Sequence, residues 1–266
     1  MAFHLIGRIA VDDVGEGPAL VCVHGLGGSA NTFLPLMPAL QRHRVISLDL
    51  PGSARSQGTT GILSIEYFVD SILEICKRLE VLQAHWVAHS MGTIVCQHLA
   101  VAYPKLVKSL TFLGPLITPS EAAREGLKLR AVKARNEGLT GMQEITHSLI
   151  ATALSNQTRQ RSPLAVAFVR ESLMCQPGEG YARSCEALAG SKAAAIEQIK
   201  APVLLITGDQ DGVAPPQAVR SMADKFHNSK SVRSVVLKDC GHWTPIEKPE
   251  DCQRELGEFL MAQARS

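Results

Sequence analysis

Three residues with complementary chemistry each stand shortly after a segment that is expected to form a β-strand. They are Ser90, Asp211 and His242, and the expected strands span residues 86–88, 202–207 and 232–237. A serine hydroxyl is too weak an acid to attack a carbonyl carbon unaided, so a base must take its proton. An imidazole can accept that proton, and a carboxylate can hold the imidazole in the required tautomer. We therefore predict Ser90 as a nucleophile, His242 as its base and Asp211 as the acid that orients the base.

The residues around Ser90 fit a sharp turn between a strand and a helix. Such a turn strains the backbone of the nucleophile and holds its hydroxyl above the sheet. The positions two before and two after the nucleophile must then be small, and here they are Ala88 and Gly92. Glycine is usual at the first of these positions, and alanine removes little space. A serine that only caps an ordinary helix is the alternative.

A glycine-rich segment with the sequence HGLGG, residues 24–28, follows an earlier apolar run at residues 19–23. Acyl transfer needs two backbone N–H donors for the negatively charged oxygen of the tetrahedral intermediate. Met91, directly after the nucleophile, and Leu26, within the glycine-rich segment, are the expected donors of this oxyanion hole. A phosphate-binding turn is the weaker alternative, because the G-x-G-x-x-G spacing is absent.

The roles of several neighbouring residues allow more than one interpretation. Asp209 is a rival to Asp211, and we prefer Asp211 because it lies further into its loop. Trp243, next to the base, either lines the substrate pocket or packs in the interior. His24 and His89 flank the expected site, and each is interpreted as a structural imidazole rather than an acid–base group.

The charge pattern argues against a nucleic-acid partner, because the formal net charge is only +2 and both signs are interspersed. A basic cluster stands at residues 124–135. Such a run is usually a solvated helix face. Our hypothesis is that Arg124 and Lys128 within it accept a carboxylate of the substrate.

The seven cysteines form no C-x-x-C pair, and their number is odd. This pattern argues against a disulfide framework or a structural zinc site and favours reduced thiols in the cytoplasm. The remaining histidines show no ligand spacing, so we expect neither a metal nor another cofactor. We expect no signal peptide and no membrane span, since no apolar stretch approaches the ~18 residues that a span needs.

Strand-like and helix-like patterns alternate in the first part of the chain and again in the last. Continuous apolar runs at 19–23, 45–48 and 86–88 are typical of strands covered on both faces, and further strands are expected at 107–113, 202–207 and 232–237. Helical patterns are expected at 31–40, 64–79, 91–102, 217–226 and 249–264, with Ser64 as an N-terminal cap. This alternation predicts an α/β fold with a mostly parallel central sheet flanked by helices.

The alternation stops between residues 116 and 199, where helical periodicity continues without a convincing strand. The helices expected there span 120–136, 141–154, 163–174 and 181–188. We predict a core domain of residues 1–115 and 200–266, interrupted by an all-helical cap at 116–199. Insertions beside the carboxyl ends of strands commonly act as lids over pockets.

Taken together, five segments resemble the α/β-hydrolase family over essentially the whole chain. They are HGLGGSANTF (24–33), DLPGSARS (49–56), AHSMG (88–92), GDQDGVAPP (208–216) and CGHWTPIEKPE (240–250). The chain looks closest to the 3-oxoadipate enol-lactonase-like and carboxylesterase branch, through its short cap and the segment EGYARSCEAL at 179–188. Enol-lactonases usually carry an aromatic pair near the position of Ala153 and Leu154, so the resemblance implies the mechanism and not the substrate.

The expected function is hydrolysis of a carboxylic ester or lactone, a small-molecule substrate, through an acyl-serine intermediate. A carbon–carbon bond hydrolase and a cofactor-free perhydrolase would use the same three residues. A ligand-binding receptor of this fold that hydrolyses slowly or not at all is the alternative from another class. The sequence leaves the oligomeric state open.

Overall fold

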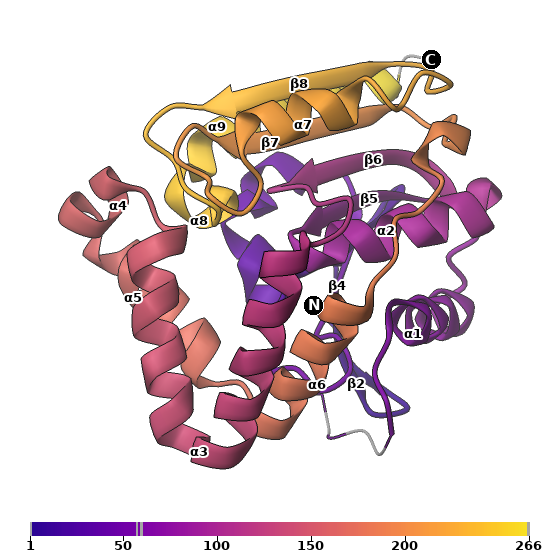
Figure 1. Cartoon of the computed structure of the whole chain (residues 1–266). Coiled ribbons are helices and arrows are strands. Elements are labelled where there is room, and N and C mark those ends of the chain that lie inside the picture. The colour runs from indigo at the N-terminus through magenta and orange to yellow at the C-terminus, as the bar shows by residue number, and fades with distance from the viewer. Residues whose placement is uncertain (1, 57, 59–60, 265–266) are drawn as a thin grey trace.

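A mixed β-sheet forms the centre of the molecule (Figure 1). The computed structural model describes residues 2–56, 58 and 61–264. Within these residues eight strands lie in the order β1-β2-β4-β3-β5-β6-β7-β8, and the sheet is parallel from β4 to β8. The strands are β1 (Ala2–Ile6), β2 (Ile9–Val14), β3 (Ala19–Val23), β4 (Arg44–Leu48), β5 (Ala84–His89), β6 (Val107–Leu113), β7 (Val203–Gly208) and β8 (Val232–Leu237).

Helices cover both faces of the sheet, and alternate side chains of each central strand pack on opposite faces. Val21 and Val23 pack in one hydrophobic cluster, whereas Leu20 and Cys22 between them pack in the other. A strand buried on both sides must be apolar throughout, which explains the continuous runs in the sequence. The helices of the core are η1 (Ala30–Leu40), α1 (Ile65–Arg78), α2 (Met91–Ala102), η2 (Pro104–Leu106), α7 (Pro216–Ala223), α8 (Thr244–Glu247) and α9 (Pro249–Gln263). A further short helix, η3 (Ile196–Gln198), lies just before β7 at the end of the segment that joins β6 to β7.

The predicted fold class is confirmed, and most predicted elements coincide with observed ones. The strands expected at 19–23, 107–113 and 232–237 and the helix at 91–102 have the predicted bounds. Ser64 caps α1 as expected, since its Oγ accepts a hydrogen bond from the N–H of Tyr67 at 3.1 Å.

Other elements differ from the prediction for identifiable reasons. The segment expected as an ordinary helix at 31–40 is a 3₁₀ helix, because Pro35 and Pro38 remove donors from its interior. The hairpin β1–β2 was not predicted. Its side chains are mostly exposed or half-buried, so it lacks the continuous apolar run used to recognise the other strands.

Residues 116–199, all of which the structure describes, contain helices and no strand; they are called the inserted segment below. Its main helices are α3 (Glu121–Ala153), α4 (Asn156–Arg161), α5 (Pro163–Met174) and α6 (Gly178–Gly190). The helices expected at 120–136 and 141–154 are two arms of α3, separated by Gly138 with a φ of 55°. Figure 1 shows α3, α4 and α5 beyond the end of the sheet to which the arrows of β6 and β8 point.

Candidate active site

Ser90 occupies a strained turn between β5 and α2. Its φ is +52° and its ψ is −121°, a conformation that non-glycine residues rarely adopt. Two glycines give this turn its space. A Cβ at Gly92 would lie 2.2 Å from the carbonyl oxygen of Val23, and one at Gly25 would lie 2.6 Å from the Cβ of Ser90. The turn therefore forms only where backbone segments can approach each other this closely.

Ser90, His242 and Asp211 form a hydrogen-bonded row. His242 Nε2 lies 2.8 Å from Ser90 Oγ, and His242 Nδ1 lies 2.9 Å from Asp211 Oδ2. Because an ionised carboxylate offers only acceptors, Nδ1 carries the proton of the neutral imidazole. Nε2 is then free to accept the proton of the serine hydroxyl. All three side chains are buried, and Ser90 is 8% exposed.

Hydrogen bonds from its own loop orient Asp211. Its Oδ1 accepts from the N–H groups of Val213 and Ala214 at 2.8 and 2.7 Å. Burial raises the pKa of Asp211, but the nearby His242 and these N–H donors outweigh burial, and the pKa lies below its ordinary value. The rival Asp209 faces elsewhere, and its Oδ1 accepts from the N–H of Cys240 at 3.1 Å. The carboxylate in contact with the His242 ring is thus that of Asp211.

Glu247, which sequence analysis did not identify, holds the backbone on both sides of His242. Its Oε2 accepts from the N–H groups of Gly241 at 3.0 Å and Ser155 at 2.8 Å, and its Oε1 accepts from the N–H of Trp243 at 3.1 Å. The side chain is buried. One carboxylate therefore joins the histidine loop to the inserted segment. A glutamate five residues after a histidine carries no distinctive signal in the sequence; its burial and partners identify it.

A second bond joins the same two parts, since the N–H of His242 donates to the carbonyl of Ala153 at 2.7 Å. Gly241 has no space for a side chain, because a Cβ there would lie 2.5 Å from that carbonyl oxygen. The position of the His242 backbone is therefore set by the end of α3 as well as by β8.

His89 packs against the ring of His242, with the ring centroids 5.2 Å apart, and stays neutral. Its Nε2 donates to the carbonyl of His242 at 2.9 Å, so Nδ1 is the unprotonated nitrogen. Burial and, to a smaller extent, the neighbouring His242 together lower the pKa of His89 to about 3. The ring of Trp243 packs against His89 with the centroids 5.4 Å apart. These contacts give His89 and Trp243 packing and positioning roles beside the row.

A tight turn formed by residues 25–28, the glycine turn, lies beside Ser90. The N–H of Gly28 donates to the carbonyl of Gly25 at 3.0 Å, and Gly27 has a φ of +76°, as the third position of a type II turn requires. Among the described residues the N–H groups of Leu26 and Met91 donate to no protein acceptor. Both predicted donors are thus free to bind an oxygen atom of a ligand.

His24 fixes the peptide group that contains the N–H of Leu26. The N–H of Leu50 donates to His24 Nε2 at 2.8 Å, so Nδ1 carries the proton and donates to the carbonyl of Gly25 at 2.7 Å. Burial lowers the pKa of His24 and keeps the ring neutral, although Asp49 opposes this effect. Since the Gly25 carbonyl and the Leu26 N–H belong to one planar unit, His24 helps to orient both.

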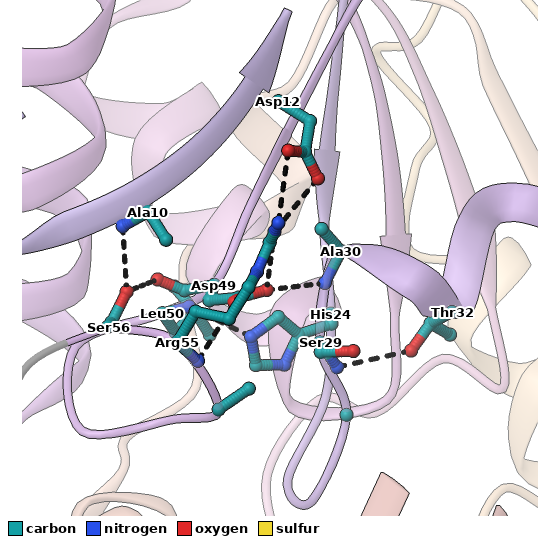
Figure 2. A network of polar contacts seen from close by, with 12 residues as sticks. Ala10, Asp12, His24, Ser29, Ala30, Thr32, Asp49, Leu50, Arg55 and Ser56 are labelled. Carbon is teal, nitrogen blue, oxygen red and sulfur yellow. Dashed lines mark hydrogen bonds and ion pairs between the residues drawn. The ribbon is translucent and has the colours of Figure 1, made fainter. Parts of the chain in front are cut away.

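Asp49 supports the glycine turn from the loop after β4, as Figure 2 shows. Its Oδ1 accepts from the N–H of Ala30 at 2.7 Å, and its Oδ2 accepts from Arg55 Nε at 2.7 Å. Arg55 in turn pairs with Asp12 on β2 at 2.8 Å. This network connects both loops to the antiparallel edge of the sheet.

The basic residues predicted to bind a substrate carboxylate have other partners. The guanidinium of Arg124 donates to the carbonyls of Ala189 and Ser191 and to Thr118 Oγ1. Lys128 is exposed and pairs with Glu125 at 2.6 Å. Neither side chain contacts the Ser90 row. The prediction failed because the sequence shows that a helix carries charges but not which way they face.

Residues 2–56, 58 and 61–264 contain neither a cluster of metal ligands nor a membrane-spanning helix. No group of three or more histidine, cysteine, aspartate or glutamate side chains there could hold a metal ion. None of the helices described is long and apolar enough to span a membrane.

Comparisons with known proteins show similarity in sequence and fold over most of the chain. A curated relative, the (E)-2-((N-methylformamido)methylene)succinate hydrolase of Acinetobacter baylyi, is 28% identical over 252 residues, which cover 92% of this chain and 91% of the relative. A solved thermophilic esterase from Thermogutta terrifontis has a TM-score of 0.88 at 25% identity, with 96% of this chain and 93% of the esterase covered. The enol-lactonase from Burkholderia xenovorans LB400 shares the fold, with a TM-score of 0.88 at 24% identity and coverage of 98% and 100%.

A family model described as the alpha/beta hydrolase fold matches residues 18–249, which include Ser90, Asp211 and His242. This match spans most of the chain and confirms the expected family. The protein belongs to the alpha/beta hydrolase family.

Proposed function

We propose that this protein hydrolyses a carboxylic ester or lactone through an acyl-Ser90 intermediate. The observation that carries the proposal is the row from Ser90 Oγ to His242 Nε2 at 2.8 Å and from His242 Nδ1 to Asp211 Oδ2 at 2.9 Å. The row starts at a residue whose strained backbone projects its hydroxyl from the turn. Folding alone does not require a strained serine whose hydroxyl is hydrogen-bonded to a buried imidazole and carboxylate.

In the first half of the proposed reaction Ser90 Oγ attacks the carbonyl carbon while His242 Nε2 accepts its proton. The carbonyl carbon becomes tetrahedral, and the negative charge on its oxygen is bound by the N–H groups of Leu26 and Met91. His242 then gives the proton to the leaving alcohol oxygen, and the acyl group remains on Ser90. In a lactone the alcohol stays attached to the acyl group.

In the second half a water molecule attacks the acyl carbon while His242 accepts its proton. His242 then returns this proton to Ser90 Oγ as the bond between the acyl group and Oγ breaks, and the carboxylic acid leaves. Asp211 stabilises the imidazolium that forms in each half and keeps the ring in one orientation. Its lowered pKa supports this role, because the carboxylate stays ionised at neutral pH.

We further propose that residues 116–199 act as a cap over the site. Support comes from the low exposure of Ser90, at 8%, and from the bonds of Ala153 and Ser155 with the histidine loop. The contacts of Arg124 and Lys128 with other protein groups give no support to a substrate-binding role for either residue. The seven unpaired cysteines favour the expected cytoplasmic location.

The experiment that tests the proposal uses p-nitrophenyl esters of short acids and a serine-directed fluorophosphonate. Wild-type protein should hydrolyse the esters and be labelled on Ser90, and Ser90→Ala should do neither. A panel of lactones, linear esters, amides and carbon–carbon substrates then identifies the preferred bond. Absence of both turnover and labelling would favour a ligand-binding receptor and refute the proposal. Labelled protein that cleaves only carbon–carbon substrates, or that acts only with peroxide, would refute the ester or lactone assignment alone.

A further inference from the structure

The far end of the glycine turn is hydrogen-bonded from the inserted segment. Ser172 Oγ, on α5, donates to the carbonyl of Gly27 at 2.7 Å. Gln176 Nε2, two residues beyond α5, lies 3.3 Å from the same carbonyl oxygen, 3.2 Å from that of Gly28 and 2.7 Å from that of Ser172. Two side chains of the inserted segment thus bind consecutive carbonyls of a turn in the core.

The amide of Gln176 also binds a second loop of the core. Its Oε1 accepts from the N–H of Ala54 at 3.2 Å, in the loop after β4, and the residue is 6% exposed. One buried amide therefore connects α5, the glycine turn and the loop after β4. A buried amide with all these partners is costly to replace, because each group left unpaired loses its hydration as well.

Apolar side chains close the space above the glycine turn. A Cβ at Gly27 would lie 2.4 Å from Leu173 Cδ2 and 3.4 Å from Tyr181 Cε2. The inserted segment thus lies directly on the turn through α5 and α6. Hydrogen bonds sheltered from water in this way are electrostatically stronger than exposed ones.

The two ends of the glycine turn are held by different parts of the protein. His24 binds the Gly25 carbonyl from the core, and Ser172 and Gln176 bind the Gly27 carbonyl from the inserted segment. Glycine peptides have wide conformational freedom, so a turn held at one end could rotate its central peptide groups. Leu26 lies between the two fixed carbonyls, and its N–H direction depends on both.

We propose that Gln176 and Ser172 are positioning residues for the oxyanion hole, which fix the direction of the Leu26 N–H through the Gly27 carbonyl. This inference rests on the proposed function, since it concerns the same oxyanion. It gives the inserted segment a part in the chemical step, beyond any covering of the substrate. Donors aligned before the reaction stabilise the transition state without a cost of reorganisation.

The test compares Gln176→Glu and Ser172→Ala with wild type on p-nitrophenyl acetate. Gln176→Glu keeps the size of the side chain and the acceptor for Ala54 but loses the donor. Gln253→Glu is the matched control, because Gln253 Nε2 also donates to a backbone carbonyl, that of Pro35 at 2.7 Å, away from the site. Losing a whole oxyanion donor lowers kcat by ~10²–10³. Gln176→Glu should only misalign the donor, so we expect a smaller fall in kcat, of about 10- to 100-fold, with little change in KM.

The discriminating measurement repeats the assay with the thiono analogue, in which sulfur replaces the carbonyl oxygen. Sulfur accepts hydrogen bonds weakly, so a well-aligned oxyanion hole helps the oxygen ester far more. If Gln176 aligns the donor, the oxygen-to-sulfur ratio of kcat/KM falls in Gln176→Glu and, less, in Ser172→Ala. The ratio should not change in Gln253→Glu.

The outcomes separate this inference from the proposed function. An unchanged ratio in both Gln176→Glu and Ser172→Ala, with an active wild type, would overturn the inference and leave the serine mechanism standing. A wild type that neither turns over the ester nor labels on Ser90 would overturn both. Should Gln176→Glu fail to fold, Ser172→Ala, which removes a single hydroxyl, carries the same test.

Discussion

Replacing Glu247 by alanine tests how the histidine loop is held in place. The substitution removes the acceptor of three backbone N–H groups, those of Gly241, Trp243 and Ser155, at 2.8 to 3.1 Å. The carboxylate is buried, so water does not replace it freely. We expect a loss of both folding stability and kcat.

The magnitude follows from the number of donors left without a partner. Each buried N–H that loses its acceptor costs ~1–3 kcal/mol, which gives ~3–9 kcal/mol for three. Water entering the space of the removed side chain would recover part of this, so we expect a loss of about 3–5 kcal/mol. For a chain of this size Tm falls by roughly 2–4 °C per kcal/mol, which corresponds to about 6–20 °C. A 1 Å displacement of His242 would lower kcat by about 10²-fold.

The assay measures Tm by circular dichroism and kcat on a p-nitrophenyl ester at a temperature where every variant is folded. The Tm and kcat of Glu247→Gln should lie between those of wild type and Glu247→Ala, because the amide oxygen can still accept hydrogen bonds while the amide nitrogen faces an N–H donor. Glu74→Ala is the control, since Glu74 is exposed and pairs with Arg78 on the helix surface. A surface ion pair of this kind contributes little, so its Tm should hardly change.

The reasoning would be refuted by a Glu247→Ala variant with a Tm close to that of Glu74→Ala and an unchanged kcat. A large fall in Tm with normal kcat at low temperature would refute only the claim that the loop position governs catalysis.

Three further predictions address the row, the turn and the buried imidazoles. Asp211→Asn should lower kcat by ~10³–10⁴ with little change in KM, as steady-state kinetics on an ester will show, and a loss below tenfold would contradict the assigned role. Gly92→Ala should fold poorly or not at all, as solubility and thermal-melt assays will show, because its Cβ would lie 2.2 Å from a backbone oxygen. The contrasting variant is Gly126→Ala, in a helix with open space around it, which should raise the unfolding free energy by about 0.5–1 kcal/mol. Burial lowers the pKa of His85 to about 4 and that of His89 to about 3, so the unfolded chain binds more protons below pH ~6.5. The unfolding free energy should therefore fall as pH decreases from ~6.5 to ~4, by up to about 1.4 kcal/mol per pH unit for each imidazole; urea titrations across this range would contradict the reasoning if they gave a constant value.

The sequence was most informative where burial on both sides forces a simple pattern. The strands before Ser90 and Asp211, β5 and β7, are mostly apolar and buried along their whole length, so both their positions and the loops that follow could be recognised. The edge strand β8 before His242 is largely exposed and includes Arg233 and Ser234, and it was recognised from the renewed alternation of strand-like and helical patterns. The order of the three residues along a parallel sheet then indicated that they would meet.

Other features depended on partners that no local pattern reveals. Glu247 and Gln176 look like ordinary surface residues in the sequence, and their importance comes from backbone groups 92 and 149 positions away. The direction of the cations on α3 was also undetermined, since helical spacing does not show that Arg124 folds back onto the end of α6. Long-range hydrogen bonds made by single side chains therefore set the limit of prediction from this sequence.

The left-handed backbone at Ser90 places stability and the proposed activity in opposition at a single position. A non-glycine residue at this φ costs ~1–3 kcal/mol, which glycine would largely avoid. A library selected only for heat resistance would therefore tend to accumulate glycine at position 90 and lose the hydroxyl. Directed evolution of a more robust variant should accordingly screen for turnover in every round, because the easiest gain in stability at this residue removes the proposed nucleophile.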